Sequence, residues 1–184
     1  NVNRTRIEST LGVDLLYYQH EYKSFVLVQY KRMEHETGGF RYRPSSSYEQ
    51  EFKRMKEFKQ KYAPDYSAPN EISQYRLSQD AFYFKLHEGE IFNPLETGLS
   101  KGMYIPFDYW ETFIDSPAAQ GSRGGINVSY DNIGRYLNNT DFITLVKSGW
   151  IGSRGSITGI IEGIVEPLIA AGRSVTIGVK AKVS

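Results

Sequence analysis

The sequence predicts an α/β fold in which a central mixed sheet is flanked by helices. Two segments, 48–62 and 156–171, repeat apolar residues at helical spacing. Segments that alternate or run apolar in the manner of strands occur before, between and after them. The chain has 184 residues, of which 40% are hydrophobic, enough for one well-packed core but short for two. We therefore expect a single domain over 1–184.

An antiparallel hairpin is expected near the start of the chain. Its strands are residues 14–19 and 23–32, which alternate or run apolar on either side of a short polar turn. The second strand is apolar on both faces, so it is expected in the middle of the sheet. The preceding segment 4–8 could end a helix or form a strand edge, and either arrangement would bring Glu8 near Asp14.

A loop and then a helix are expected after the hairpin. Residues 33–47 contain two adjacent glycines, a proline and three serines, which is typical of a loop. Over 48–62, Ser47 is the candidate N-cap, acidic residues occupy the first turn and lysines the last, and Pro64 lies just beyond the end. The apolar residues of this helix are expected to face the core.

The rest of the chain is expected to add strands and helices to this sheet. In chain order we expect a strand at 74–86, a strand at 102–107, a short helix at 108–114, a surface loop at 116–125, helices at 130–146 and 156–171, and a strand at 174–183. The glycine-rich segment 149–155 lacks the Gly-Lys-Ser/Thr ending of a phosphate loop. It predicts instead a tight turn around a buried Trp150.

Three polar residues accompany the hairpin. Asp14 enters its first strand, and Gln29 and Lys31, two residues apart at the end of the second, share one face. The Asp14 carboxylate, the Gln29 amide and the Tyr30 backbone carbonyl offer the oxygen ligands that a hard divalent cation takes. Lys31 would orient or deprotonate the attacking water and stabilise charge on a phosphate. The alternative is an ordinary hairpin in which Lys31 and Arg32 are solvated strand-end charges.

This arrangement resembles the PD-(D/E)XK nuclease superfamily, whose signature is a lone acidic residue on one strand and a D/E-x-K tripeptide on its neighbour. Asp14 matches the first acid, and Gln29-Tyr30-Lys31 matches the tripeptide in a glutamine-substituted form. The context is similar to a branch found in restriction and phage-defence proteins, in which a Gly-x-Asp segment precedes a strand that ends in Gln-x-Lys-Arg. The resemblance covers roughly residues 1–60.

The resemblance implies a restriction-endonuclease-like core with C-terminal additions, and a Mg²⁺- or Mn²⁺-dependent endonuclease that cleaves DNA in restriction or anti-phage defence. It implies Asp14, Gln29, Lys31 and Glu8 as catalytic residues, with Glu8 also an accessory metal ligand. Related nucleases contribute a polar residue from the helix after the lysine strand, and Gln50 is the position that matches. The candidate nucleic-acid contacts are Arg32, Arg41, Arg43, Gln50, Lys53 and Arg54.

The distribution of charge fits a local rather than a global affinity for nucleic acid. The formal net charge is only +1, which excludes a bulk polycation. Between Lys31 and Lys61, however, nine basic residues face five acidic ones. This excess follows the proposed catalytic strand directly, although a solvated helix of mixed charge would look the same.

The cysteine and histidine content and the lack of a long apolar segment exclude several other classes of protein. There are no cysteines, which excludes disulfides and thiolate zinc sites, and the three histidines share no metal-ligand spacing. No segment reads as a membrane span or a signal peptide, so we expect a cytoplasmic protein without a membrane partner. Because the sequence begins with Asn1, it could be cut from a longer protein. A homo-oligomer, or further domains or subunits of a defence system, are the expected partners besides DNA.

Two other functions stay open at this point. A neutral glutamine holds a divalent ion less tightly than a carboxylate does, so the chain could be an inactive binding or assembly module that keeps the nuclease fold. The motif also reports phosphate chemistry rather than the kind of polymer, so RNA is a possible substrate. Metal binding at Asp14 separates the first alternative from an active enzyme.

Overall fold

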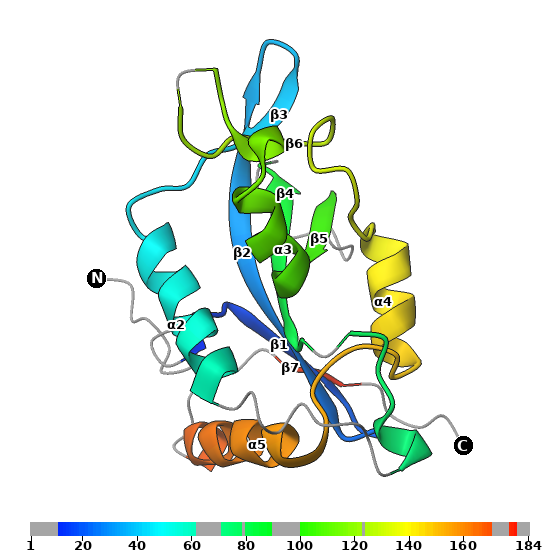
Figure 1. Ribbon diagram of the computed structural model, residues 1–184. Helices are drawn as coiled ribbons and strands as arrows, with labels where there is room; N and C mark the ends of the chain where they lie inside the picture. Colours follow the sequence, from blue (N-terminus) through cyan, green and yellow to red (C-terminus); the bar gives the residue numbers. More distant parts are fainter. Residues whose placement is uncertain are drawn as a thin grey trace.

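The computed structural model describes residues 11–61, 71–78, 80–89, 100–122, 124–170 and 177–179. They form an α/β fold in which helices flank one mixed sheet, as expected (Figure 1). None of the helices in these ranges combines the length and the apolar character that crossing a membrane requires.

The sheet is built around one long strand. The strands are β1 (Leu15–Gln19), β2 (Ser24–Glu36), β3 (Gly39–Tyr42), β4 (Phe82–Glu88), β5 (Gly102–Pro106), β6 (Val128–Ser129) and β7 (Ile177–Val179). The main order is β5-β4-β2-β1-β7, and β3 pairs with the far end of β2 and with β6. Strand β2 is antiparallel to β1 and parallel to β4, so the sheet is mixed and β2 lies at its centre, as its two-sided apolar pattern predicted.

Among the described residues, four α-helices cover the sheet: α2 (Tyr48–Lys61), α3 (Phe107–Ile114), α4 (Asn139–Lys147) and α5 (Gly155–Ala170). Helices α2, α3 and α5 pack into the larger apolar core on one face, which includes Met55, Trp110 and Ile161. Helix α4 packs on the opposite face through Phe142 and Val146. The described connections contain the short 3-10 helices η2 (Ile72–Gln74) and η3 (Pro117–Ala119).

The N-terminal hairpin is confirmed, but the loop expected at 33–47 is wrong in its first half. Strand β2 continues to Glu36 and turns into β3, with His35 opposite Phe40. The adjacent glycines Gly38 and Gly39 both adopt positive φ, at 99° and 111°. Gly38 lies in the two-residue turn of a second hairpin and Gly39 is the first residue of β3, opposite Glu36, and glycine reaches such angles without a steric cost.

Three further expectations on the C-terminal side are wrong. The strand expected from residue 74 begins only at Phe82. The helix expected over 130–146 begins at Asn139, where the Asn138 side chain accepts a hydrogen bond from the Asp141 amide (2.9 Å). Before it, the chain runs as a strand-like bridge and pairs Leu137 with β5. Trp150 is 45% exposed rather than buried.

The other elements agree with the bounds expected from the sequence. Helices α2, α3 and α5 and strand β5 lie within one residue of the expected bounds. The expected loop at 116–125 contains η3 and a bridge between Gln120 and Ile126, so it has more local structure than its composition predicted. Of the strand expected at 174–183, only β7 lies among the described residues.

The burial of the Asp80 carboxyl should make the stability of the fold depend on pH. Asp80, just before β4, is 2% exposed, and burial raises its pKa to about 6 although Lys59 of α2 lies 2.9 Å away. Since this value exceeds that of the unfolded chain, the folded state keeps a proton that the unfolded state has lost between pH 4 and 6. Asp80 therefore contributes to the free energy of unfolding at pH 4, and this contribution of about 3 kcal/mol is lost by pH 7.

We expect Asp80→Asn to remove that component. Urea unfolding followed by circular dichroism between pH 4 and 7 should show a smaller decline with rising pH in the variant than in the wild type. Parallel curves for the two proteins would contradict the assignment.

Candidate functional site

The hairpin places Asp14 beside Gln29. The Asp14 amide donates to the Val28 carbonyl at 3.0 Å, and Leu15 lies opposite Val28 in the register. The next position along both strands therefore brings Asp14 across from Gln29, with both side chains on the face that α2 covers. The spacing in the sequence predicted this pair, and the pairing register of β1 and β2 produces it.

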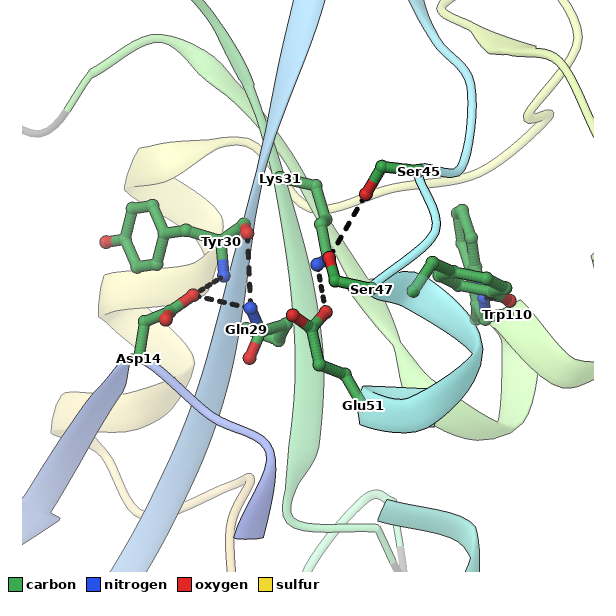
Figure 2. Close-up of polar contacts among 9 residues, drawn as sticks. Asp14, Gln29, Tyr30, Lys31, Ser45, Ser47, Glu51 and Trp110 are labelled. Carbon is green, nitrogen blue, oxygen red and sulfur yellow. Dashed lines mark hydrogen bonds and ion pairs between the residues drawn. The ribbon is translucent and has the colours of Figure 1, made fainter. Parts of the chain in front are cut away.

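The Asp14 carboxylate accepts hydrogen bonds from two neighbouring groups of the site (Figure 2). Its Oδ2 accepts hydrogen bonds from Gln29 Nε2 at 2.6 Å and from the Tyr30 amide at 2.8 Å. The same Gln29 nitrogen lies 3.4 Å from the Tyr30 carbonyl oxygen. The carboxylate, amide and carbonyl that the sequence assigned to a metal ion thus converge, although Asp14 itself is exposed.

Gln29 has an unsatisfied acceptor. Its side chain is 3% exposed, and Oε1 is buried without a hydrogen-bond partner. An orphaned buried amide oxygen costs about 1–3 kcal/mol, so its presence calls for an explanation. A hard cation takes amide, carboxylate and carbonyl oxygens, although here the amide nitrogen, and not Oε1, faces Asp14 and the Tyr30 carbonyl. The donor set therefore fits a divalent ion chemically.

Lys31 points toward α2 and forms an ion pair with Glu51 (Figure 2). The two residues are 9% and 7% exposed, so a charge of each sign is held within the protein. The expected helix residue, Gln50, is exposed and does not face this pair. Glu51 was missed, yet the sequence holds a signal for it: it lies three residues after Tyr48 and four before Met55, on the apolar face of the helix.

Gly12 fixes the distance between the Asp14 segment and α2. Its φ is +70°, and a Cβ added there would lie 3.0 Å from the Glu51 carbonyl oxygen. The glycine of the Gly-x-Asp segment therefore allows the close approach of the backbone that holds Glu51. This is a physical reason for glycine at that position.

We expect Gly12→Ala to destabilise the fold by about 1–2 kcal/mol, because a Cβ is strained at positive φ. Gly163→Ala is the matched control. It lies within α5, where an added Cβ meets nothing within 4 Å, and it should stabilise by about 0.5–1 kcal/mol. Urea unfolding measures both, and equal effects would contradict the role of Gly12.

The start of α2 brings two hydroxyl groups close to the ion pair. Ser45 and Ser47 share a hydrogen bond of 3.1 Å between their Oγ atoms, near Lys31 and Glu51 (Figure 2). The Ser47 carbonyl accepts the Glu51 amide at 3.2 Å, which begins the helix. Hydroxyls and a helix N-terminus beside a lysine form an environment suited to a phosphate oxygen.

Several of the basic residues proposed from the sequence as nucleic-acid contacts already form ion pairs with carboxylates. Arg41 and Arg43 both pair with Glu36, and the Arg43 guanidinium lowers the pKa of that carboxyl. Lys53 lies 3.7 Å from Glu57 one turn later, and both are exposed. Exposed pairs of this kind contribute little to stability, so phosphate could compete for the cations.

The other two cations lie closer to the sheet. Arg32 is exposed and approaches the Gly89 carbonyl at 3.5 Å, and Arg54 is partly buried on α2. Glu8, the expected accessory ligand, lies outside the described residues. Within the described ranges, no three His, Asp or Glu side chains gather as a metal cluster. The donor set therefore consists of one carboxylate and two neutral oxygens.

The opposite face of β2 packs into the second apolar core, which contains tyrosines. The Tyr30 side chain lies there near Tyr17 and Tyr104, and burial raises its pKa, so its hydroxyl stays protonated. Lys85 of β4 is fully buried, 4.0 Å from the Tyr104 ring centroid, and hydrogen-bonds Asn139. Burial lowers the Lys85 pKa to about 8.

Comparison of the chain with protein-family models, with curated proteins and with solved structures finds no match. The functional argument therefore rests on the geometry of Asp14, Gln29, Lys31 and Glu51.

Proposed function

We propose that this protein is a metal-dependent nuclease that hydrolyses DNA phosphodiester bonds, with a role in restriction or anti-phage defence. The observation that carries the proposal is the pairing of Asp14 with a buried glutamine whose Oε1 has no hydrogen-bond partner, two residues from a buried lysine on the same strand. Metal ligands and a cation for the phosphate are thereby adjacent.

The proposed ligands are Asp14, Gln29 Oε1 and the Tyr30 carbonyl, with Glu8 as an accessory group. A bound Mg²⁺ or Mn²⁺ would polarise the phosphate and acidify a water molecule. Gln29 now turns its nitrogen toward Asp14, so ligation through Oε1 requires the amide to rotate. Such a rotation exchanges one hydrogen bond for a bond to the ion, since the nitrogen and oxygen of the amide occupy similar positions.

Lys31 and Glu51 act together in this proposal. The Lys31 ammonium stabilises negative charge that develops on the phosphate and orients the attacking water. Glu51 is a positioning residue, because its carboxylate holds the ammonium against the strand. Arg32, Arg41, Arg43, Lys53 and Arg54, together with the hydroxyls of Ser45 and Ser47, are the proposed contacts to the phosphate backbone.

The restriction-endonuclease-like core belongs to the proposal. It is supported by the order of the elements, in which an antiparallel pair carrying Asp14 and Lys31 is followed by α2 and then by β4 parallel to β2. A helix that connects parallel strands of one sheet packs against that sheet. The β3–β6 extension and helices α4 and α5 are additions to this arrangement.

The alternative function is an inactive nuclease-fold module that binds or assembles with other molecules. The specific observation in its favour is the Gln29–Asp14 hydrogen bond, which satisfies the carboxylate without an ion. RNA is the alternative substrate for an active site of the same geometry.

Plasmid cleavage and calorimetry test the proposal together. We expect the wild type to nick or linearise supercoiled DNA with Mg²⁺ or Mn²⁺, and EDTA to abolish this. Titration with Mn²⁺ should give a binding heat that Asp14→Ala removes and that Gln50→Ala, an exposed change on α2, leaves intact. Absence of both cleavage and metal binding would favour the inactive module. Metal binding with cleavage of RNA alone would change the substrate.

A further inference from the structure

A cavity lined by charged residues lies at the opposite end of β1 from Asp14. The turn between β1 and β2, the segment that contains η2 and the first turns of α5 surround a volume of about 470 Å³. Asp14 precedes β1, whereas Tyr22 of this cavity follows it, so the cavity is separate from the proposed nuclease site (Figure 1). Six charged residues line the cavity: Glu21, Lys23, Glu71, Arg76, Arg154 and Glu162.

The charges of this cavity are separated by depth. Arg76 and Arg154 are 5% and 7% exposed, so these two residues form its floor. The rim consists of the more exposed charged residues, Glu21, Lys23, Glu71 and Glu162. A ligand that enters therefore passes mainly acidic groups and meets two positive charges at the bottom.

Backbone oxygens hold the Arg76 guanidinium in place. Its Nη1 donates to the carbonyls of Ser73 at 2.9 Å and Tyr75 at 2.8 Å, and its Nη2 donates to the Tyr22 carbonyl at 3.1 Å. Within the described part of the chain, every hydrogen bond of this side chain thus ends on a neutral oxygen. Its Nε is buried without a hydrogen-bond partner among the same residues. These contacts fix the guanidinium but do not neutralise its charge.

Arg154 adds a second positive charge beside the first. Burial and then the charge of Arg154 lower the pKa of the Arg76 guanidinium. Like charges that are held together away from water cost free energy, which an anion bound to both would recover. A guanidinium suits an oxyanion in particular, because its planar fork can donate two hydrogen bonds to one phosphate.

The N-terminus of α5 contributes to the same cavity. Gly155, Thr158 and Gly159, from the first two turns of this 16-residue helix, line its wall. The amides of a first helical turn have no partner within the helix and carry a partial positive charge. The helix therefore adds donors for a phosphate group beside the two buried guanidinium groups.

We propose that this cavity binds a small phosphate monoester that also carries hydroxyl groups, the class that includes sugar phosphates and nucleoside monophosphates. The phosphate binds to Arg76, Arg154 and the start of α5, and the carboxylates of the rim accept hydrogen bonds from the hydroxyl groups. Carboxylates accept from ribose hydroxyls in the same way in dinucleotide-binding folds. The acidic rim disfavours a polyanion such as DNA, and the volume suits a small molecule.

Calorimetry of the whole protein in EDTA tests the proposal, because the Asp14 site then has no metal through which to hold phosphate. We expect ribose 5-phosphate or adenosine 5′-monophosphate to bind with a Kd of about 1 mM or lower. Inorganic phosphate should bind about tenfold more weakly than the better ester, since it has no sugar hydroxyls for the rim. Equal affinity for inorganic phosphate would overturn the proposal. Failure of both esters to bind would do so too, even if a 5′-phosphorylated DNA oligonucleotide bound.

A carboxylate added to the wall locates the ligand. Gly159 is exposed on α5, and a Cβ added there meets no atom within 4 Å, so Gly159→Glu should fold and should weaken binding of the better ester by at least about tenfold. Gly163→Glu is the matched control, because it adds the same charge one turn later, beyond the residues that line the cavity. It should change the affinity by less than about twofold.

Arg76→Gln, which removes the buried charge, should weaken binding at least as much as Gly159→Glu. Because it also removes contacts to three backbone carbonyls, circular dichroism must show that it folds, and Gly159→Glu decides the question if it does not. Equal affinities of Gly159→Glu and Gly163→Glu would place the ligand elsewhere and overturn the proposal. Since binding is measured without metal and away from Asp14, its result is independent of the nuclease proposal.

Discussion

Replacement of Lys31 by methionine is expected to lower the rate of DNA cleavage by about 10²- to 10⁴-fold, the contribution of a positioned acid–base or cationic group. The ammonium is the only part of the side chain that methionine removes, because the two stems have similar length. The ammonium belongs to a residue of β2 that lies two positions from Gln29, so the strand fixes its place in the site. Single-turnover cleavage of a supercoiled plasmid measures the effect.

Loss of folding must be separated from loss of chemistry in this test, because Lys31→Met leaves Glu51 buried without its partner. The double variant Lys31→Met/Glu51→Gln removes both charges and keeps both shapes. We expect it to fold and to bind Mn²⁺ but not to cleave. Cleavage by the double variant at the wild-type rate would show that Lys31 has no part in the reaction.

The N-terminal part of the site could be predicted because its causes are local. Strand alternation sets the face of Gln29 and Lys31, and the short turn to β1 sets the register that brings Asp14 across from Gln29. The ends of α2 follow from the acidic first turn and basic last turn that the sequence shows directly.

The role of Glu51 could not be predicted from the sequence in the same way. A helix pattern gives the apolar face, and Glu51 lies on it, but a carboxylate there is favourable only if a cation from another element reaches it. That cation comes from β2 through tertiary packing. Gln50 was preferred because its residue type matched related nucleases, whereas the packing of α2 turns that position toward solvent.

Two errors elsewhere have the same origin. The helix was expected to start before Asn139 although Gly134 interrupts that segment, and Leu137 instead pairs with Tyr104 of β5 in both directions, at 2.8 and 2.9 Å. Trp150 was expected to be buried because tryptophan usually is. Its side chain is instead 45% exposed.

Removal of the Glu51 carboxylate is expected to have the largest effect on stability. Glu51→Ala leaves the Lys31 ammonium in a position that is 9% exposed, with no carboxylate beside it. Breaking a buried ion pair from one side costs about 3–5 kcal/mol, because the remaining charge has lost both its partner and its water. Urea unfolding by circular dichroism at neutral pH should show this loss as a lower midpoint with an unchanged slope.

A double-mutant cycle tests whether the buried charge is the cause. Glu51→Gln keeps an oxygen that can accept from Lys31, so it should cost less than Glu51→Ala. Lys31→Met/Glu51→Leu removes both charges and should recover most of the loss, since apolar replacement of a whole buried pair is often neutral. If the two substitutions proved additive, the penalty would come from lost packing on α2 rather than from the stranded ammonium. The coupling between Lys31 and Glu51 would then be too weak for Glu51 to position the lysine for catalysis.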